Sequence, residues 1–192
     1  MYICLLRHGE TDWNNVGKLQ GREDVPLNTA GIEQIKEASH YLNQFNWKII
    51  ITSPLSRAKA SAEIISQEIG NIPIYENVDF IERDYGKASG MTPEERKLNF
   101  PDGKWIGMEA FETLQNRTVN ALMKCIKEYE GKDIIIASHG AAIHSIVAYL
   151  SNNEIDIWKI IPKNASMTLL KKANDKFEII FFNKTAKELI EN

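Results

Sequence analysis

The chain has 192 residues, of which 43% are hydrophobic and 26% charged, and its formal net charge is −3 at pH 7. This length and composition predict one domain, residues 1–192, with a sizeable core. The slight excess of acid excludes a broadly basic surface, so we expect neither a nucleic acid nor a membrane as partner. Cys4 and Cys125 lie in apolar patterns and are expected to be reduced thiols of a cytoplasmic protein.

The first half of the chain alternates strands with helices. Residues 2–6 and 48–52 are apolar runs that predict buried strands. Asn28 and Thr29 can cap a helix. Its inward stripe is expected at Ile32, Ile35, Ala38, Leu42 and Phe45. Ser53 and Pro54 predict the start of a second helix, with serine as cap and proline in the first turn. Its stripe is expected at Leu55, Ala58, Ala62, Ile65 and Ile69. Residues 72–81 are expected to be extended.

Residues 83–108 break this alternation. The segment holds four glycines and two prolines, and only residues 93–98 show a short helical pattern. A long irregular insertion in a compact domain is usually functional. We therefore expect a lid-like insertion over the active site.

The second half returns to regular elements. The pattern predicts a long helix at 109–130, a strand at 134–137 and a helix from about 141 to 150. Two further strands, 166–171 and 177–182, are joined by an Asn174-Asp175 turn, and a short helix follows. Alternating strands and helices predict an α/β three-layer sandwich. Its central sheet is expected to be mostly parallel, with helices on both faces and an antiparallel edge.

Two strand ends resemble each other. The first strand runs into Arg7, His8 and Gly9, and the strand 134–137 runs into Ser138, His139 and Gly140. Ligands of open α/β sheets bind beyond the carboxyl ends of parallel strands, so both imidazoles can enter one crevice. Two histidines could hold a metal. The arginines Arg7 and Arg57 favour an anion instead, because a guanidinium matches phosphate oxygens. We therefore expect no metal and no cofactor.

These residues lie in ordered motifs that resemble the histidine phosphatase superfamily, also called phosphoglycerate mutase-like. Residues 7–14 are similar to its RHGETxxN signature, residues 21–27 to GRxDxPL and residues 53–58 to SxLxRA. Residues 138–140 are similar to its second-histidine motif. Glu82 falls where the family places its acid. Glu109 and Arg117 resemble its GES-to-Arg segment, although Ala110 replaces the usual serine. The resemblance covers residues 2 to about 150.

The resemblance implies a mechanism through a phosphohistidine. His8 would attack the phosphoryl group, and Glu82 would protonate the leaving oxygen and then activate water. Arg7, Arg57 and His139 would hold the phosphoryl oxygens, with His139 protonated beside the dianion. Asn14 would add a further hydrogen bond. Other candidate acids are Glu10 and Asp84. The remaining candidate contacts to substrate or phosphate are Thr11, Gln20, Gly21, Arg22 and Gly140.

Several residues keep a second interpretation. Arg22 could instead pair with Asp24. His40 is expected at the surface, and His144 as an ordinary core or surface histidine, or at the outer rim of the pocket. Most tryptophans are expected to be packing residues, although Trp13 and Trp105 could wall the site.

Three functions remain open at this point. A metal-independent phosphatase acting on a small phosphorylated metabolite is favoured. The alternatives are a bisphosphate-primed phosphoglycerate mutase and a non-catalytic phospho-ligand-binding protein on the same fold. A mutase needs extra cations for its acid substrate, but residues 86–108 offer only Lys87, Arg96, Lys97 and Lys104. The substrate itself and the oligomeric state, a homodimer included, stay open.

Overall fold

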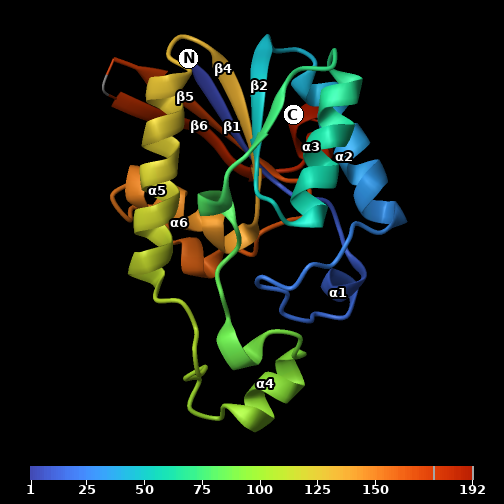
Figure 1. Ribbon diagram of the computed structural model, residues 1–192, viewed down its shortest axis with the longest axis vertical. Helices are drawn as coiled ribbons and strands as arrows, with labels where there is room; N and C mark the ends of the chain where they lie inside the picture. The colour runs from blue at the N-terminus through green and yellow to red at the C-terminus, as the bar shows by residue number, and fades with distance from the viewer. Residues whose placement is uncertain (175, 192) are drawn as a thin grey trace.

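The computed structural model describes residues 1–174 and 176–191, and a single mixed sheet lies at its centre (Figure 1). The strand order is β3-β2-β4-β1-β5-β6. The parallel strands are β1 (Tyr2–Arg7), β2 (Trp47–Thr52), β3 (Ile74–Glu76) and β4 (Asp133–Ser138). Strand β5 (Met167–Ala173) is antiparallel to both β1 and β6 (Lys176–Lys184). This confirms the predicted α/β fold with an antiparallel edge.

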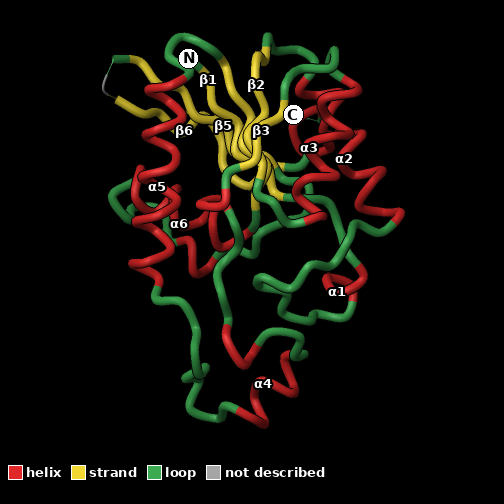
Figure 2. The backbone as a smooth tube through the Cα atoms, viewed as in Figure 1, coloured by secondary structure: helices red, strands yellow, loops and turns green. Residues whose placement is uncertain are grey.

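Helices cover both faces of the sheet (Figure 2). Helices α2 (Thr29–Leu42), α3 (Ser56–Glu68) and α7 (Ala186–Ile190) pack on one side, and α5 (Phe111–Glu128) and α6 (Gly140–Leu150) on the other. Two short helices, α1 (Asp12–Asn15) and α4 (Pro93–Asn99), lie beyond the carboxyl edge of the sheet. Three single 3-10 turns span Val78–Phe80, Gly86–Ala88 and Ile157–Lys159.

Alternating side chains of the central strands supply both cores. Ile3 and Leu5 of β1 pack with α5 and α6, whereas Cys4 and Leu6 face α2 and α3. All four residues are at most 1% exposed. A strand buried on both faces must be apolar at every position, which explains the continuous apolar runs in the sequence. Each fully buried leucine or isoleucine stabilises the fold by about 1.5–3 kcal/mol.

Several element boundaries differ from the sequence prediction. Helix α3 begins at Ser56, not at Pro54, and its cap residue Leu55 makes no side-chain cap bond. Ile32 is 37% exposed and does not belong to the inward stripe of α2. Within residues 72–81, only Ile74–Glu76 pairs as a strand, and a 3-10 turn follows. Of the predicted hairpin turn, Asp175 lies outside the described residues.

The sheet has its topological switch between β1 and β4. These strands are neighbours in parallel register, with Arg7 opposite Ser138. The chain leaves β1 toward α2 on one face and leaves β4 toward α6 on the other face. Diverging connections open a crevice at the carboxyl ends of two strands, where α/β proteins bind ligands.

A close backbone crossing fixes the loop that follows β1. A Cβ atom on Gly9 would overlap the carbonyl group of Gly31, and a Cβ atom on Gly31 would overlap the backbone of Glu10. The amide of Gly9 also donates to Ser61 Oγ of α3 at 3.2 Å. The loop after β1 is therefore held against both α2 and α3.

The segment 83–108 lies beyond the carboxyl edge of the sheet, in the lower part of Figure 1 around α4. Backbone bonds join it to the segment after α1. Leu19 N–H donates to Met91 O at 3.0 Å, and Gly90 N–H donates to Leu19 O at 2.7 Å. Its two ends also meet, since Lys87 N–H donates to Ile106 O at 2.9 Å.

Candidate active site

A cavity of about 140 Å³ opens at the carboxyl ends of β1 and β4. Ligand pockets for drug-sized molecules occupy roughly 300–1,000 Å³, so this cavity suits a small ligand. Polar and charged side chains dominate its wall. The lining residues are Arg7, His8, Asn14, Lys18, Leu19, Gln20, Gly21, Arg57, Glu82, Tyr85, Gly140, Ala141 and Pro162.

His8 is held as a neutral imidazole. Its Nδ1 lies 2.6 Å from the carbonyl oxygen of Gly9, which can only accept, so Nδ1 carries the proton. Nε2 is then the nitrogen with a free lone pair. Burial lowers the pKa of His8 well below its usual value, and the charges of Arg7 and Arg57 lower it further. Such an imidazole is a nucleophile at neutral pH.

Two guanidinium groups supply the positive charge of the cavity. Arg57 is 1% exposed and donates to the carbonyls of Glu23 at 2.7 Å and Gly21 at 2.8 Å. Arg7 donates through Nη1 to the Pro162 carbonyl. The Nε atoms of both arginines are buried and have no partner among the described residues. Burial lowers the pKa of Arg57 to about 10, although Glu82 and Asp24 oppose the shift, so it stays charged at neutral pH.

His139 faces His8 across the two strand ends, with ring centroids 5.2 Å apart. Its Nε2 lies 2.7 Å from Ser53 Oγ, and its Nδ1 has no partner among the described residues. Burial, and then the charge of Arg57, lowers the pKa of His139 well below its usual value. The free site therefore holds a neutral His139. Its expected protonation concerns the phosphate-bound state and stays a prediction.

Glu82 is 8% exposed and reaches the amino end of α6. Its carboxylate accepts from the amides of Arg83 at 2.9 Å, Ala142 at 3.1 Å and Ala141 at 3.2 Å. Ser138 Oγ donates to the carbonyl of Phe80 at 2.8 Å and ties the preceding turn to the end of β4. These contacts place the Glu82 carboxylate in the wall of the cavity that His8 also lines.

An ion-pair network fixes the backbone that carries Glu82. The Arg117 guanidinium on α5 donates to both carboxylate oxygens of Glu109 at 2.8 and 2.9 Å. It also donates to the carbonyls of Asp79, Ile81 and Glu82. Arg117 thus fixes the backbone of residues 79–82 against α5. The resemblance placed Glu109 and Arg117 in one motif, and the structure shows this contact between them.

The other candidate residues divide into two groups. Asn14, Gln20, Gly21 and Gly140 line the cavity. Thr11 caps α1, and the Arg22 guanidinium lies 3.5 Å from Glu109 and 3.8 Å from Asp84, so neither lines it. The alternative pairing of Arg22 with Asp24 is wrong, because Asp24 accepts from the Ser56 amide at 2.7 Å.

Three further polar residues lie at the site and were not predicted there from the sequence. Ser53 was expected to cap a helix; its Oγ accepts from the Leu55 amide at 3.4 Å, before the helix begins, and also contacts His139. Asn164 Nδ2 donates to Gly9 O at 3.2 Å and to Asn14 Oδ1 at 3.1 Å. Lys18 lines the cavity with its Nζ 5.5 Å from the ring centroid of Trp13. It forms no ion pair within 4 Å among the described residues.

The aromatic wall comes from the insertion. Tyr85 lines the cavity, and Trp105 packs edge-on against its ring at 5.8 Å. Burial raises the pKa of Tyr85, so its hydroxyl stays protonated. Trp13 contacts Lys18 rather than forming a wall by itself.

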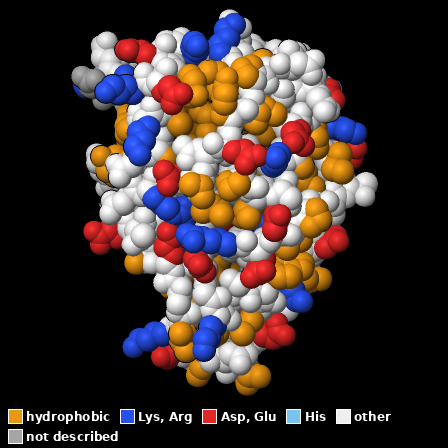
Figure 3. Space-filling view, in the orientation of Figure 1, with side chains coloured by type: hydrophobic (Ala, Val, Ile, Leu, Met, Phe, Trp, Pro, Cys, Tyr) orange, Lys and Arg blue, Asp and Glu red, His pale blue; other side chains and the backbone are white. Residues whose placement is uncertain are grey.

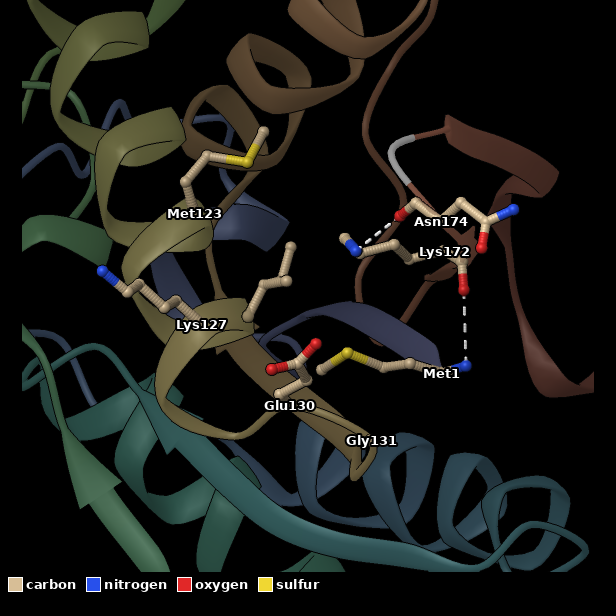
Figure 4. A pocket seen from close by; sticks show the side chains of 8 residues that line it. Met1, Met123, Lys127, Glu130, Gly131, Lys172 and Asn174 are labelled. Carbon is tan, nitrogen blue, oxygen red and sulfur yellow. Dashed lines mark hydrogen bonds between the residues drawn. The ribbon is translucent and has the colours of Figure 1, made fainter.

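Two larger cavities lie near the opposite edge of the sheet. One of about 520 Å³ is lined by Met1, Met123 and Lys172 among others (Figure 4). Some of its polar groups bind each other: the Met1 amino group donates to Lys172 O, and Lys172 Nζ donates to Asn174 O. A neighbouring cavity of about 590 Å³ shares Met123 and Lys172. Neither brings a histidine or an acid–arginine pair together, so the smaller cavity is the candidate site.

Three further observations concern metal ligands, membrane spans and surface charge. Within residues 1–174 and 176–191, no three His, Cys, Asp or Glu side chains are grouped to hold a metal ion. No helix in the described part of the chain is long and apolar enough to span a bilayer. On the face seen in Figure 3, basic side chains lie among acidic ones.

Comparisons with known proteins agree with this geometry. The family model of the histidine phosphatase superfamily (branch 1) matches residues 3–185. "Uncharacterized phosphatase PhoE" of Bacillus subtilis (strain 168) is 42% identical over 94% of this chain and 93% of its own length. "Probable phosphoglycerate mutase GpmB" of Salmonella paratyphi A is 30% identical over 77% of this chain and 74% of its own.

A solved structure extends the likeness to three dimensions. Phosphoserine phosphatase of Entamoeba histolytica, in complex with 3-phosphoglyceric acid, superposes with a TM-score of 0.83 at 29% identity. The match covers 96% of this chain and 97% of that one.

Proposed function

The chain belongs to branch 1 of the histidine phosphatase superfamily, and from this premise we propose that it is a metal-independent phosphomonoesterase acting through a phosphohistidine on His8. The observation that carries the proposal is the state of His8. Its Nδ1–H is given to the Gly9 carbonyl, which leaves Nε2 free inside a cavity with two guanidinium groups. The conclusion that the protein is a phosphatase rests also on its relatives.

The first step forms a bond from His8 Nε2 to phosphorus and breaks the bond to the ester oxygen. Arg7, Arg57 and His139 stabilise the charge on the equatorial oxygens, and Asn14 adds a hydrogen bond. Glu82 delivers a proton to the leaving oxygen. In the second step, water attacks the phosphohistidine, Glu82 accepts the proton of that water, and inorganic phosphate leaves.

The cations of the insertion do not reach the cavity, and this favours hydrolysis over a mutase reaction. None of Lys87, Arg96, Lys97 and Lys104 lines the cavity. Arg96 donates to Met91 O at 2.7 Å and lies over Trp105, so it is already engaged. A mutase needs several cations to retain its doubly charged intermediate, and the insertion adds none to the cavity, where Lys18 is the one lysine among the described lining residues. The binding-only alternative is disfavoured because every catalytic group is present.

Lys18 defines the substrate more closely. Its unpaired ammonium group stands at a cavity whose phosphate end already has Arg7 and Arg57. A small phosphate ester with a carboxylate a few bonds away places its second charge against Lys18. The bound 3-phosphoglyceric acid of the Entamoeba histolytica structure is a ligand of this class.

The free, buried thiols Cys4 and Cys125 fit our expectation of the cytoplasm.

The mechanism is tested by hydrolysis of phenyl phosphate in the presence of a metal chelator. We expect turnover by the wild-type protein, with an acid-labile phosphoryl group trapped on His8 in rapid quench. The variant His8→Ala should lose both, while the matched surface variant His40→Ala retains both. Turnover by His8→Ala at the wild-type rate, or activity that chelation abolishes, would overturn the proposal.

The substrate class is tested with two esters of equal length. Glycerol 3-phosphate carries a hydroxymethyl group where 3-phosphoglycerate carries its carboxylate. Wild-type kcat/KM should favour 3-phosphoglycerate, and Lys18→Gln should reduce that preference about tenfold, the value of one lost charge-assisted contact. Lys87→Gln, an exposed lysine of the insertion, is the control. An unchanged preference in Lys18→Gln would refute this role but leave the phosphohistidine step standing.

A further inference from the structure

Arg7 separates the candidate active site from a second, much smaller cavity. Both cavities are lined by Arg7, Gly140 and Pro162. The second one has a volume of about 10 Å³ and is closed on its far side by His144, Thr168 and residues of β6. A volume of this size accommodates about one water molecule.

Two buried polar atoms at this cavity have no hydrogen-bond partner among the described residues. They are Arg7 Nε, which can only donate, and His144 Nε2. His144 is 8% exposed and its ring packs against Phe182 at 5.4 Å. An unpaired buried polar group destabilises a fold, and two at one cavity are rare in a native protein.

The two atoms have complementary hydrogen-bonding roles. Burial, and then the charge of Arg7, lowers the pKa of His144 to about 4, so its imidazole is neutral near pH 7. A neutral imidazole has one acceptor nitrogen, and Nε2 suits that role opposite a donor. Thr168 Oγ1, which accepts from the Asn183 amide at 3.2 Å, adds a third polar atom. Buried waters typically bind two to four such groups.

We propose that this cavity holds a water molecule that accepts from Arg7 Nε–H and donates to His144 Nε2, which makes His144 a positioning residue for Arg7. With Nη1 bound to the Pro162 carbonyl, a second fixed nitrogen determines the plane of the guanidinium. Its remaining N–H groups then point into the phosphate site. A planar guanidinium must keep its orientation to meet phosphate oxygens in a bidentate manner.

Gly140 contributes to the same arrangement. A Cβ atom at this position would lie 3.1 Å from two carbons of Pro162 and 3.6 Å from Arg7 Nε. A side chain here would press on the groups that line both cavities. The glycine of the second-histidine motif therefore leaves the space in which Arg7 reaches its two partners.

The test compares His144→Leu with His144→Gln, which restores an acceptor at similar reach. The readouts are the dissociation constant of inorganic phosphate by calorimetry, kcat/KM for phenyl phosphate and the thermal midpoint. His144→Leu should weaken phosphate binding and lower kcat/KM about tenfold, as for one lost hydrogen bond to a charged group. Its thermal midpoint should change little, because leucine keeps an apolar contact with Phe182 while only the bond to the water is lost. His144→Gln should recover most of the loss.

Two controls isolate the link to Arg7. His40→Leu, the same substitution at an exposed site of α2, should leave all three readouts unchanged. In an Arg7→Lys background, which removes Nε–H, His144→Leu should lower kcat/KM by less than about twofold. Wild-type phosphate affinity in His144→Leu, equal losses in the leucine and glutamine variants, or a full effect in the Arg7→Lys background would each overturn the inference. Because phosphate binding requires no turnover, a protein that fails to hydrolyse esters refutes the proposed function without deciding this one.

Discussion

Replacing Arg117 with methionine removes the side chain that ties the segment before Glu82 to α5. The guanidinium makes five hydrogen bonds, two to the Glu109 carboxylate and three to backbone carbonyls, with distances from 2.7 to 3.0 Å. Methionine matches the length of the alkyl stem but donates no hydrogen bond. The substitution therefore isolates the polar contacts from the packing.

The expected loss of stability follows from burial. The side chains of Arg117 and Glu109 are 16% and 8% exposed. Burial alone would raise the pKa of Glu109, but the hydrogen bonds and charge of Arg117 outweigh it and hold that pKa below its usual value. Without Arg117, the carboxylate keeps the Arg22 ion pair at 3.5 Å and the hydrogen bond from the Asp84 amide at 3.2 Å. Removing one partner of a buried pair costs about 3–5 kcal/mol, and we expect the lower half of that range here.

Urea unfolding followed by far-ultraviolet circular dichroism measures this loss, provided that the slope with urea is unchanged. Catalysis gives a second readout, because a displaced Glu82 should lower kcat more for alkyl esters, which need a proton on the leaving oxygen, than for aryl esters. Lys36→Met is the control, since its partner Glu33 is an exposed neighbour on α2 and exposed ion pairs contribute little to stability.

A double variant tests whether Arg117 and Glu109 act as a pair. Glu109→Leu combined with Arg117→Met replaces a nearly buried pair with apolar groups, so it should be more stable than Arg117→Met alone. If Arg117→Met lost less than about 1 kcal/mol, or if the double variant lost the sum of both single effects, the buried network would not hold Glu82 as described.

Three further predictions concern single residues. Gly31→Ala should destabilise the protein by about 1–3 kcal/mol in urea unfolding, although alanine favours helices, because its Cβ overlaps the backbone of Glu10. A gain in stability would contradict the close crossing. The pKa of His144 is about 4 in the folded protein and 6.5 for an unperturbed group. As the pH falls, the unfolded chain therefore takes up this proton before the folded protein does. Protonation of the buried ring therefore lowers the free energy of unfolding by up to about 3 kcal/mol as the pH falls from 6.5 toward 4, and has no effect above pH 6.5. The stability of His144→Leu should therefore fall less over this range, and parallel curves would refute it. Ser53→Ala removes the 2.7 Å bond to His139 and should lower kcat/KM about tenfold, with Ser53→Thr restoring most of it. An unaffected Ser53→Ala would show that His139 needs no such support.

The sheet could be predicted from the sequence because its signals are local. Strand β1 and strand β4 are apolar at successive positions, as burial on both faces requires. The matching His-Gly pairs after these strands indicated one crevice, and the register that places Arg7 beside Ser138 provides it. Periodicity and strand-end position were sufficient for this part of the site.

Contacts between distant segments could not be predicted in this way. Serine before proline is a common helix start, and only the fold shows that Ser53 Oγ meets His139, 86 residues later. Asn164 approaches Gly9 from a loop with no motif of its own. Lys18 lies between the motifs at residues 7–14 and 21–27, and nothing in its sequence position indicates that it lines the cavity. Its role depends on how residues 83–108 fold back over residues 18–21.

The backbone crossing at Gly9 and Gly31 gives the site one wall that tolerates almost no substitution, whereas the other wall tolerates exchange of side chains. One wall rests on main-chain atoms in direct contact, so nearly any side chain at either glycine is excluded regardless of its chemistry. The opposite wall, residues 83–108, meets the segment 18–21 through two backbone bonds. Side chains can be exchanged there without moving His8. Divergence of substrate preference among descendants of such a chain should therefore accumulate on that wall, while the reaction stays the same.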